Sequence, residues 1–395
     1  MHAYLQNRIM KKYIAKIKHN INKILAKNSI SLKPNGAING YVLLSYFISP
    51  FLLKEDQSIP NSHTNQWECF QIANTFLKLG YAVDVINYTD EQFLPAKNYS
   101  FFIDIHRNLE RLSPHLNADC IRILHITGAH WLFQNQAEYA RLLALQKRRG
   151  ITLAPRRIAP PSLGIEIADL ATILGNEFTI KTFTYAKKPI YRIPISTTNR
   201  YEWMPGKNYE KCRNNFLWFG SSGMVHKGLD LVLEAFSEMP EYNLTVCGPI
   251  QQEEDFEKAF FKELYQTSNI HTVGWIDTST SKFTKILESC IGLIYPSCSE
   301  GGGGSAITCM HGGLIPILSY ESSVDVLDFG FILNDSSINE IKKTVNVLAN
   351  LPAKELKMRS RKAWEFVRAN HTKERFSEEY QKFVIKTLKV SREVN

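Results

Sequence analysis

The chain has 395 residues, more than one hydrophobic core usually organises, so we expect two domains of roughly 150 to 200 residues each. Apolar residues make up 44% and charged residues 22% of the chain, a composition that excludes disordered, collagen-like and fibrous proteins. The formal net charge is +9, but residues 1–28 hold seven Lys or Arg and no acid, so the remainder is nearly balanced and we expect no nucleic-acid partner.

The first segment, residues 1–30, has the pattern of a basic amphipathic helix. Its apolar residues recur at steps of four and three: Met10, Ile14, Ile17, Ile21 and Ile24. Lysines fill the other face of the helix. Two interpretations fit equally: attachment to an anionic membrane surface through residues 1–28, or docking on the protein's own body or on a second copy. A mitochondrial presequence is less favoured, because such segments prefer Arg over Lys.

The cysteines and the apolar runs indicate a compartment. The chain has seven scattered cysteines and no C-x-x-C, which argues against a disulfide framework or a zinc ribbon. The longest apolar run, 41–53, is too short to span the ~30 Å hydrocarbon layer of a membrane. The basic start also lacks the continuous apolar stretch of a secretory signal. We therefore expect a cytoplasmic protein, peripheral on the inner face of the membrane if the first helix binds lipid.

Residues 31–200 alternate short β-branched or aromatic runs with helical stretches. We expect strands over 40–48 and 81–88, with a helix over 67–79 that ends at Gly80 between them. Later segments extend this alternation: strands over 99–105 and 120–126, a helix over 136–148, and further runs over 165–174 and 190–195. Alternation of this kind predicts a parallel sheet covered by helices on both faces.

A polar, irregular stretch over 196–215, with Pro205-Gly206, is expected to link two domains. The alternation then resumes in a second domain over 210–370. The expected strands are 216–219, 243–247, 270–273, 291–295 and 315–318, and the expected helices are 229–238, 253–265, 280–289 and those from 338 onward. The fold class is therefore α/β, with two similar halves that face each other.

A glycine-rich turn follows the first strand of this second half. Gly220, Ser221, Gly223, Lys227 and Gly228 lie between the strand and the next helix. Backbone N–H groups, a helix N-terminus and a lysine together suit a phosphate. The turn is neither a Walker A loop nor a G-x-G-x-x-G fingerprint, so an ordinary strand-to-helix turn with a surface lysine is equally compatible.

Four consecutive glycines, 301–304, follow Glu300 between a buried strand and a helix. Glycines are tolerated where backbone approaches a ligand closely or takes positive φ, so we expect phosphate or sugar binding there. A flexible linker is the alternative, but no Ser/Gly-rich stretch surrounds the run. Glu300 comes just after the carboxyl end of a strand, where ligands bind in open α/β sheets.

These motifs agree in order and spacing with a known family. Residues 216–385 resemble the nucleotide-sugar-binding half of retaining glycosyltransferases with the GT-B fold, especially glycosyltransferase family 4. The matching motifs are Gly220 with Lys227-Gly228, Val246-Cys247-Gly248, Val273-Gly274-Trp275, and Pro296-Ser297 with Glu300-Gly301. The resemblance implies two Rossmann-like domains that face a central cleft, with acceptor binding in 31–200, donor binding in 210–370, and a helix over 371–395 that crosses back to the first domain.

The resemblance also implies roles for single residues. Lys227 would hold the donor diphosphate, Glu300 would contact the donor sugar, and the backbone of Gly303, Gly304 and Ser305 would meet phosphate or sugar. Other expected donor contacts are Gly220, Ser221, Gly248, Gly274, Trp275, Gly301 and Thr308. The chain departs from the family where the Arg of the first turn falls on Ser221 and where the second Glu, which usually holds the ribose, falls on Thr308.

Histidines supply the candidates in the first half. His106, at the end of an expected strand, matches the position of a catalytic histidine in related enzymes, although a lone histidine is as often structural. His63, Thr64 and Asn65 are candidate acceptor contacts or, equally, residues that cap the following helix. His130 is a further acceptor candidate.

We expect a retaining enzyme that moves a sugar from a nucleoside-diphosphate sugar to a hydroxyl of a glycan or lipid-linked acceptor, in glycan, polysaccharide or lipopolysaccharide assembly. The chain contains no D-x-D, so we expect no metal and no cofactor. A catalytically silent GT-B protein is the main alternative, because of Ser221 and Thr308. A nicotinamide-dependent oxidoreductase ranks lower, because the chain lacks G-x-G-x-x-G followed by an acid.

Overall fold

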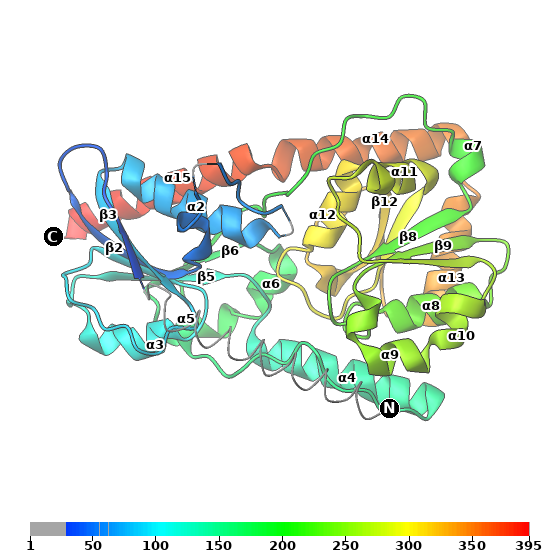
Figure 1. Ribbon diagram of the computed structural model, residues 1–395, viewed down its shortest axis with the longest axis horizontal. Helices are drawn as coiled ribbons and strands as arrows, with labels where there is room; N and C mark the ends of the chain where they lie inside the picture. Colours follow the sequence, from blue (N-terminus) through cyan, green and yellow to red (C-terminus); the bar gives the residue numbers. More distant parts are fainter. Residues whose placement is uncertain (1–28, 55, 62, 395) are drawn as a thin grey trace, which may run out of the picture.

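The computed structural model describes residues 29–54, 56–61 and 63–394 as two α/β domains that lie side by side (Figure 1). The predicted N-terminal helix and its membrane contact through residues 1–28 lie outside the described residues. Residues 29 and 30, which that prediction included, belong to strand β1, Ser29–Leu32. In the described part of the chain, no helix is both long enough and apolar enough to cross a membrane.

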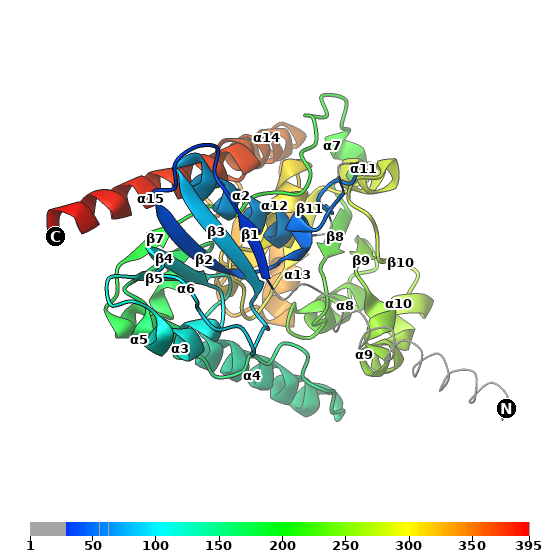
Figure 2. The same ribbon diagram turned by 60° about the vertical axis from the view of Figure 1, so that its left-hand side comes forward.

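The N-terminal domain contains a seven-stranded sheet with the order β1-β3-β2-β4-β5-β6-β7. Each strand pairs in parallel with its neighbour, except that β1 is antiparallel to β3. The strands after β1 are β2 (Gly40–Tyr46), β3 (Tyr81–Asn87), β4 (Phe101–Asp104), β5 (Ile121–Ile126), β6 (Leu170–Ile173) and β7 (Ile190–Arg192). The predicted parallel sheet is therefore confirmed, with an antiparallel edge strand, visible in Figure 2, that was not predicted.

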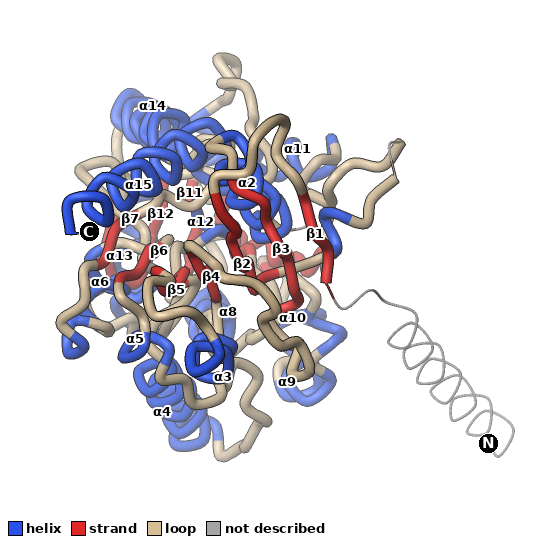
Figure 3. Tube along the Cα trace, turned by 90° about the vertical axis from the view of Figure 1, so that its left-hand side faces the viewer, coloured by secondary structure: helices blue, strands red, loops and turns tan. Residues whose placement is uncertain are grey.

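Helices cover both faces of this sheet, with α2 and α15 on one side and α3, α4 and α5 on the other (Figure 3). The helices of the domain are α2 (Thr64–Lys78), α3 (Asn108–Leu112), α4 (Trp131–Arg149), α5 (Gly164–Ile167) and α6 (Glu177–Lys181), with 3₁₀ turns at Ser49–Phe51, Ser113–His115 and Thr184–Ala186. Helix α4 begins five residues before the predicted start, because the His130 side chain caps it and accepts a hydrogen bond from the Leu132 N–H.

The C-terminal domain contains a six-stranded parallel sheet with the order β10-β9-β8-β11-β12-β13. Its strands are β8 (Asn215–Phe219), β9 (Asn243–Cys247), β10 (Ile270–Gly274), β11 (Gly292–Tyr295), β12 (Ile315–Ser319) and β13 (Phe331–Leu333). Most residues of β8, β11 and β12 are buried, as expected for central strands covered on both faces. The three-residue β13 was not predicted.

The helices of this domain are α7 (Tyr209–Cys212), α8 (Leu229–Ser237), α9 (Glu254–Ala259), α10 (Phe261–Gln266), α11 (Ser281–Ser289), α12 (Gly304–His311) and α13 (Ile338–Ala349), with 3₁₀ turns at Ile250–Gln252 and Tyr320–Ser322. The helix predicted over 253–265 is two helices that break at Phe260. This residue is buried and stacks on Phe256, with ring centroids 4.6 Å apart. Burial of both rings thus outweighs continuation of a single helix.

Three segments cross between the domains. The predicted linker 196–215 is more buried than its polar sequence suggests, since Lys207 is buried and donates to the Leu287 carbonyl at 2.9 Å. Helix α14 (Ala353–Asn370) lies on the second domain, and α15 (Lys373–Val394) continues from it back to α2 of the first (Figure 1). On the other side of the molecule, α4 extends from the first domain beneath the second, where Arg148 pairs with Asp230.

Candidate active site

The candidate site lies at the carboxyl ends of β8 and β11. These two strands are parallel neighbours at the centre of the C-terminal sheet, and the strand order changes direction between them. The segments that follow β8 and β11 therefore run to opposite sides of the sheet, and this is the position where open α/β sheets bind ligands. Lys227 follows β8, and Glu300 follows β11.

Lys227 and Glu300 form a buried ion pair. The Lys227 Nζ atom lies 2.6 Å from Glu300 Oε1, and the two side chains are 3% and 12% exposed. The same carboxylate oxygen accepts hydrogen bonds from the Tyr295 hydroxyl at 2.7 Å and the Ser297 hydroxyl at 2.9 Å. Among the described residues, Glu300 Oε2 accepts no hydrogen bond. The pair thus presents one carboxylate oxygen that a ligand hydroxyl can reach.

The electrostatics keep Glu300 ionised. Burial raises the pKa of this carboxyl group, but the electrostatic influence of Lys227, His226 and Arg157 outweighs burial and lowers the pKa to about 2. Burial lowers the pKa of the Lys227 ammonium group, and Glu300 opposes that change. Burial and the Glu300 charge raise the pKa of Tyr295 well above its usual value, so its hydroxyl stays protonated and donates.

The turn after β8 is shaped by contact with the segment after β11. Gly228 has φ +70° and caps α8, and a Cβ atom there would lie 2.6 Å from the Pro296 carbonyl oxygen. Glycine is therefore required for the two segments to lie against each other. The Trp218 indole N–H donates to the Lys227 carbonyl at 3.2 Å and holds the lysine backbone in place.

The turn after β8 binds an anionic group, but this group is a carboxylate of the protein itself. The backbone N–H groups of Gly223 and Met224 both donate to the carboxylate of Glu253. Two amides that we expected to face phosphate are therefore engaged by the protein itself. Ser221, in the family's arginine position, is exposed.

The glycines predicted to meet the nucleotide lie in a row at the ends of β8, β9 and β10. The Gly220 N–H donates to the Cys247 carbonyl at 3.1 Å, and the Gly248 N–H donates to the Gly274 carbonyl at 2.9 Å. The Trp275 side chain, next in sequence, is 65% exposed. This row lies on the β9 side of the Lys227 turn, so a ligand on Lys227 can extend along it.

Two of the four glycines lie at a contact between the domains. A Cβ atom on Gly301 would lie 2.0 Å from the Thr127 carbonyl oxygen of the first domain, and one on Gly302 would lie 3.3 Å from the Leu174 carbonyl oxygen. Gly303 has φ +57° and caps α12, whose first residue is Gly304. Close approach of the two domains thus accounts for Gly301 and Gly302, and ligand contact at the four glycines stays a prediction.

Ser305 and Thr308 lie in the first turns of α12. The Ser305 hydroxyl hydrogen-bonds to Tyr295, next to the ion pair. Thr308 is nearly buried, and its hydroxyl donates to the Gly304 carbonyl at 2.8 Å. That hydrogen bond occupies the only proton of the Thr308 hydroxyl, which can then only accept from a ligand.

Of the predicted histidines, His63 is the one whose pKa responds to the charges of the ion pair. Partial desolvation lowers the pKa of this exposed side chain, followed by the charges of Arg157 and Lys227, while Glu300 raises it. Its Nδ1 atom also accepts from the Asn65 N–H at 3.2 Å, so His63 itself, rather than Thr64 or Asn65, caps α2. Thr64 is buried at the first position of the helix.

His106 and His130 lie elsewhere in the first domain. His106 stacks edge-on against Tyr88 with ring centroids 5.7 Å apart, and no hydrogen bond or ion pair between described residues joins it to Lys227 or Glu300. The His130 Nε2 atom lies 3.0 Å from the Tyr185 hydroxyl, at the edge of a cavity of about 410 Å³ that Leu163 and Glu166 also line. Among the described residues, the structure thus pairs Lys227 with Glu300, and no hydrogen bond or ion pair joins His63, His106 or His130 to them.

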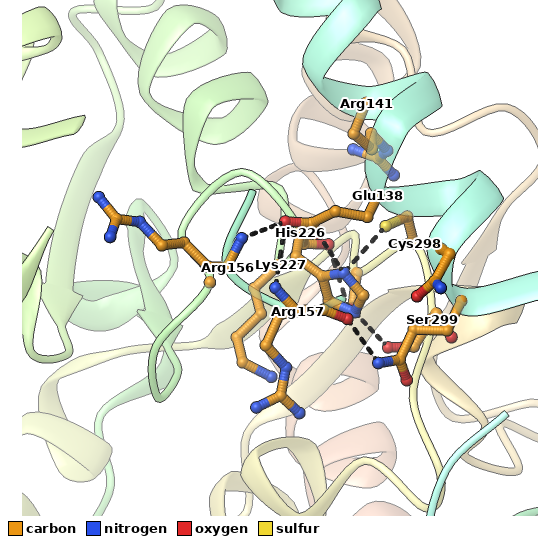
Figure 4. Close-up of polar contacts among 12 residues, drawn as sticks. Glu138, Arg141, Arg156, Arg157, His226, Lys227, Cys298 and Ser299 are labelled. Carbon is orange, nitrogen blue, oxygen red and sulfur yellow. Dashed lines mark hydrogen bonds and ion pairs between the residues drawn. The ribbon is translucent and has the colours of Figure 1, made fainter. Parts of the chain in front are cut away.

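A buried cluster between the domains was missed from the sequence (Figure 4). Glu138 of α4 lies 2.7 Å from His226 Nδ1, and His226 Nε2 lies 2.7 Å from the Ser299 carbonyl oxygen. The Cys298 thiol completes the cluster at 3.5 Å from His226 Nδ1. These three side chains have the spacing of metal ligands, but both histidine nitrogens have partners and burial raises the Cys298 pKa to about 12. The chemistry therefore fits a hydrogen-bond network better than a metal centre.

The sequence of the second domain matches a known protein family. Residues 208–363 match the family Glycosyl transferases group 1. This match covers most of the C-terminal domain, which we call the group 1 domain. Lys227 and Glu300 lie inside the matched segment, whereas His63, Glu138 and Arg157 lie outside it. No curated protein matches the chain in sequence at a significant level.

Several solved structures resemble this chain over both of its domains. A trehalose-phosphate synthase (UDP-forming) from Burkholderia vietnamiensis has a TM-score of 0.60 at 9% identity, covering 90% of this chain and 98% of its own. HepE from Anabaena, in complex with UDP and glucose, has a TM-score of 0.54 at 11% identity, covering 89% and 99%. The predicted GT-B fold, with the group 1 domain as its second half, is thereby confirmed.

TarM from S. aureus, whose structure holds UDP, is similar over a smaller share of its length. Its TM-score is 0.50 at 14% identity, and the match covers 71% of this chain and 54% of TarM. This chain therefore spans about half the length of TarM.

Proposed function

We propose that the chain is a glycosyltransferase that moves a sugar from a nucleoside-diphosphate sugar to a hydroxyl group of a glycan or a lipid-linked acceptor. The observation that carries this proposal is the buried Lys227–Glu300 pair in the group 1 domain. The lysine suits a diphosphate, and the free oxygen of the ionised glutamate suits the hydroxyls of a sugar. Retention of anomeric configuration is proposed from the family resemblance.

Different residues stabilise the two groups that separate when the donor bond breaks, the diphosphate and the sugar. The bond from the anomeric carbon to the diphosphate oxygen breaks, and the diphosphate leaves with the electron pair. The acceptor oxygen then bonds to the anomeric carbon and passes its proton to the departing diphosphate oxygen. Lys227 and the N-terminus of α12 stabilise the negative charge that grows on the diphosphate, and Glu300 orients the sugar and stabilises its positive charge.

We propose that no divalent metal or cofactor takes part. Fixed protein charges at Lys227 would neutralise the leaving group in place of a metal ion. Transfer should therefore continue in EDTA. A strict requirement for added Mg²⁺ or Mn²⁺ would refute this part of the proposal.

A catalytically silent nucleotide-sugar-binding protein is the second candidate. The observation that favours it is Thr308, which replaces the family's second glutamate and donates its only hydroxyl proton within α12. A protein of this kind would bind donor and release no nucleotide.

We propose a cytoplasmic enzyme, peripheral on the inner face of the membrane, that takes part in polysaccharide or lipopolysaccharide assembly. Residues 1–28, with their apolar stripe and seven basic residues, support membrane attachment. A lipid-linked acceptor would be presented at that surface.

The experiment is a thermal-shift screen with UDP-, GDP- and ADP-sugars, followed by an assay of nucleotide release with and without acceptor extract. UDP-sugars come first, because HepE and TarM hold UDP in their structures. A thermal shift with acceptor-dependent nucleotide release supports the transferase. A shift without release supports the silent protein, and the absence of any shift overturns both candidates.

A further inference from the structure

The proposed donor site needs a second cation to offset the negative charge of a diphosphate. Lys227 is neutralised by Glu300 at 2.6 Å, so the pair presents almost no net charge to a diphosphate. Two backbone amides of the turn are occupied by Glu253, and position 221 carries an exposed serine. Tight binding of a diphosphate requires fixed positive charge, which the turn after β8 alone does not supply.

Arg157 of the first domain places a second cation beside the pair. Its charge lowers the pKa of both the Glu300 carboxyl group and the Lys227 ammonium group. Figure 4 shows the Arg157 and Lys227 side chains extending in the same direction from the buried cluster. The stem of Arg157 lies over Gly223, where a Cβ atom would be 2.7 Å from Arg157 Cγ.

Unlike its neighbours Arg148, Arg149 and Arg156, Arg157 has no carboxylate partner among the described residues. Arg148 pairs with Asp230, Arg149 with Glu263, and Arg156 with Asp255. Within the described residues, the Arg157 side chain forms no hydrogen bond, and its Nε atom is buried without a partner. A buried guanidinium donor without a partner is costly in free energy, which points to a ligand that would satisfy it.

Glu138 contacts both the backbone of Arg157 and the residue before Lys227. Its N–H donates to Glu138 Oε1 at 3.3 Å, and its carbonyl accepts from Gln134 at 2.6 Å. The other oxygen of Glu138 contacts His226, the residue before Lys227. Glu138 thus fixes the spacing between the two cations although they come from different domains.

We propose that Arg157 binds the diphosphate of the donor together with Lys227, and so provides from the first domain the cation that Ser221 does not provide. The inference rests on the proposed function. It makes the diphosphate site a composite of both domains, complete only when the loop after α4 is docked on the group 1 domain.

The test is calorimetric titration of the full chain with UDP, GDP, ADP and inorganic pyrophosphate. Arg157→Ala should weaken binding of the preferred diphosphate by about 10- to 100-fold, as expected for loss of a charge-assisted hydrogen bond. Arg157→Lys should restore part of that loss, because it keeps the charge. Arg156→Ala is the matched control, since it removes an equal charge from the same loop but from the Asp255 side, and it should change affinity by less than about 3-fold.

The outcomes separate this inference from the proposed function. If Lys227→Met abolishes diphosphate binding while Arg157→Ala binds as the wild type does, only the role of Arg157 is overturned. If the wild type binds none of the four probes, the donor site and the role of Arg157 are overturned together. A melting curve for each variant checks that it is folded, and the Arg157→Ala/Ser221→Arg double variant should regain affinity lost in the single variant. Failure of both Arg157→Lys and the double variant to regain any affinity would contradict a direct role in charge.

Discussion

Replacing Glu300 with glutamine tests the site most directly, because glutamine keeps the shape of the side chain and removes only its charge. The Lys227 ammonium group would then lie 97% buried opposite a neutral amide. The Tyr295 and Ser297 hydroxyls would keep an oxygen to which they can donate, so the local packing should survive. The substitution therefore separates the charge of Glu300 from its volume.

The size of the effect on stability follows from the pKa of Glu300. Its ordinary value of 4.5 falls to about 2 in the folded protein, a difference worth about 3 kcal/mol of folding free energy at neutral pH. Because the folded pKa is the lower one, this contribution is complete above about pH 4.5 and is lost as the pH falls toward 2. Glu300→Gln should therefore lower the melting temperature by several degrees at pH 7, and by roughly half as much at pH 3.

The effect on activity should be larger than the effect on folding. Transfer should fall by at least ~100-fold in Glu300→Gln, because the variant loses charge stabilisation in the transition state. The assay is release of nucleoside diphosphate in the presence of acceptor, at a temperature where melting curves show the variant to be folded. Lys342→Ala is the control, since Lys342 forms an exposed ion pair with Glu238 in the same domain and should leave transfer unchanged.

Two results would refute this reasoning. Wild-type transfer in folded Glu300→Gln would remove Glu300 from the chemistry. A loss of stability that is the same at pH 3 and pH 7 would show that the charge of Glu300 is not what stabilises the fold.

Three further predictions concern other parts of the chain. His63→Ala should reduce transfer by about 10-fold or more, and His106→Ala should reduce it less, with kcat and KM measured for both; the reverse order would restore His106 as the catalytic candidate. Gly301→Ala should destabilise the protein by about 1–3 kcal/mol through its clash with Thr127, whereas Gly304→Ala, whose Cβ atom would lie at an ordinary contact distance of 3.6 Å from Ile195, should not; equal melting temperatures would contradict the domain contact. Deletion of residues 1–28 should weaken sedimentation with anionic vesicles but not with neutral ones, and unchanged sedimentation would favour docking on the protein itself.

The sequence predicted most of the second domain, and the reason is physical. Each strand there is a short buried run, and the turns after β8 and β11 combine glycine with a charged residue at the edge where ligands bind, so Lys227 and Glu300 were found by pattern and spacing. The departures arise where two distant segments meet. Glu253 occupies the amides of Gly223 and Met224 from 29 or 30 residues away, and no local pattern announces that contact.

The first domain was harder to predict, because its contributions depend on how the domains dock. Arg157 is one of two adjacent arginines between prolines, a pattern typical of many exposed loops. Its proximity to Lys227 follows from Glu138, whose partner His226 lies 88 residues further along the chain. The acceptor role of His63 stays a prediction for the same reason, since sequence spacing carries no information on the distance between the two halves.

The basic end of α4 has a consequence for how a substrate gains access. Arg148 and Arg149 reach across to acidic residues of the second domain, while α14 and α15 span the boundary on the opposite side. If the two domains separate, these partly exposed arginines lose their carboxylate partners and are hydrated instead. Dissolved salt screens the attraction within the ion pairs and so lowers the free-energy cost of that separation. Ionic strength should therefore govern the rate at which the molecule admits its ligand, independently of how firmly the ligand is held once inside.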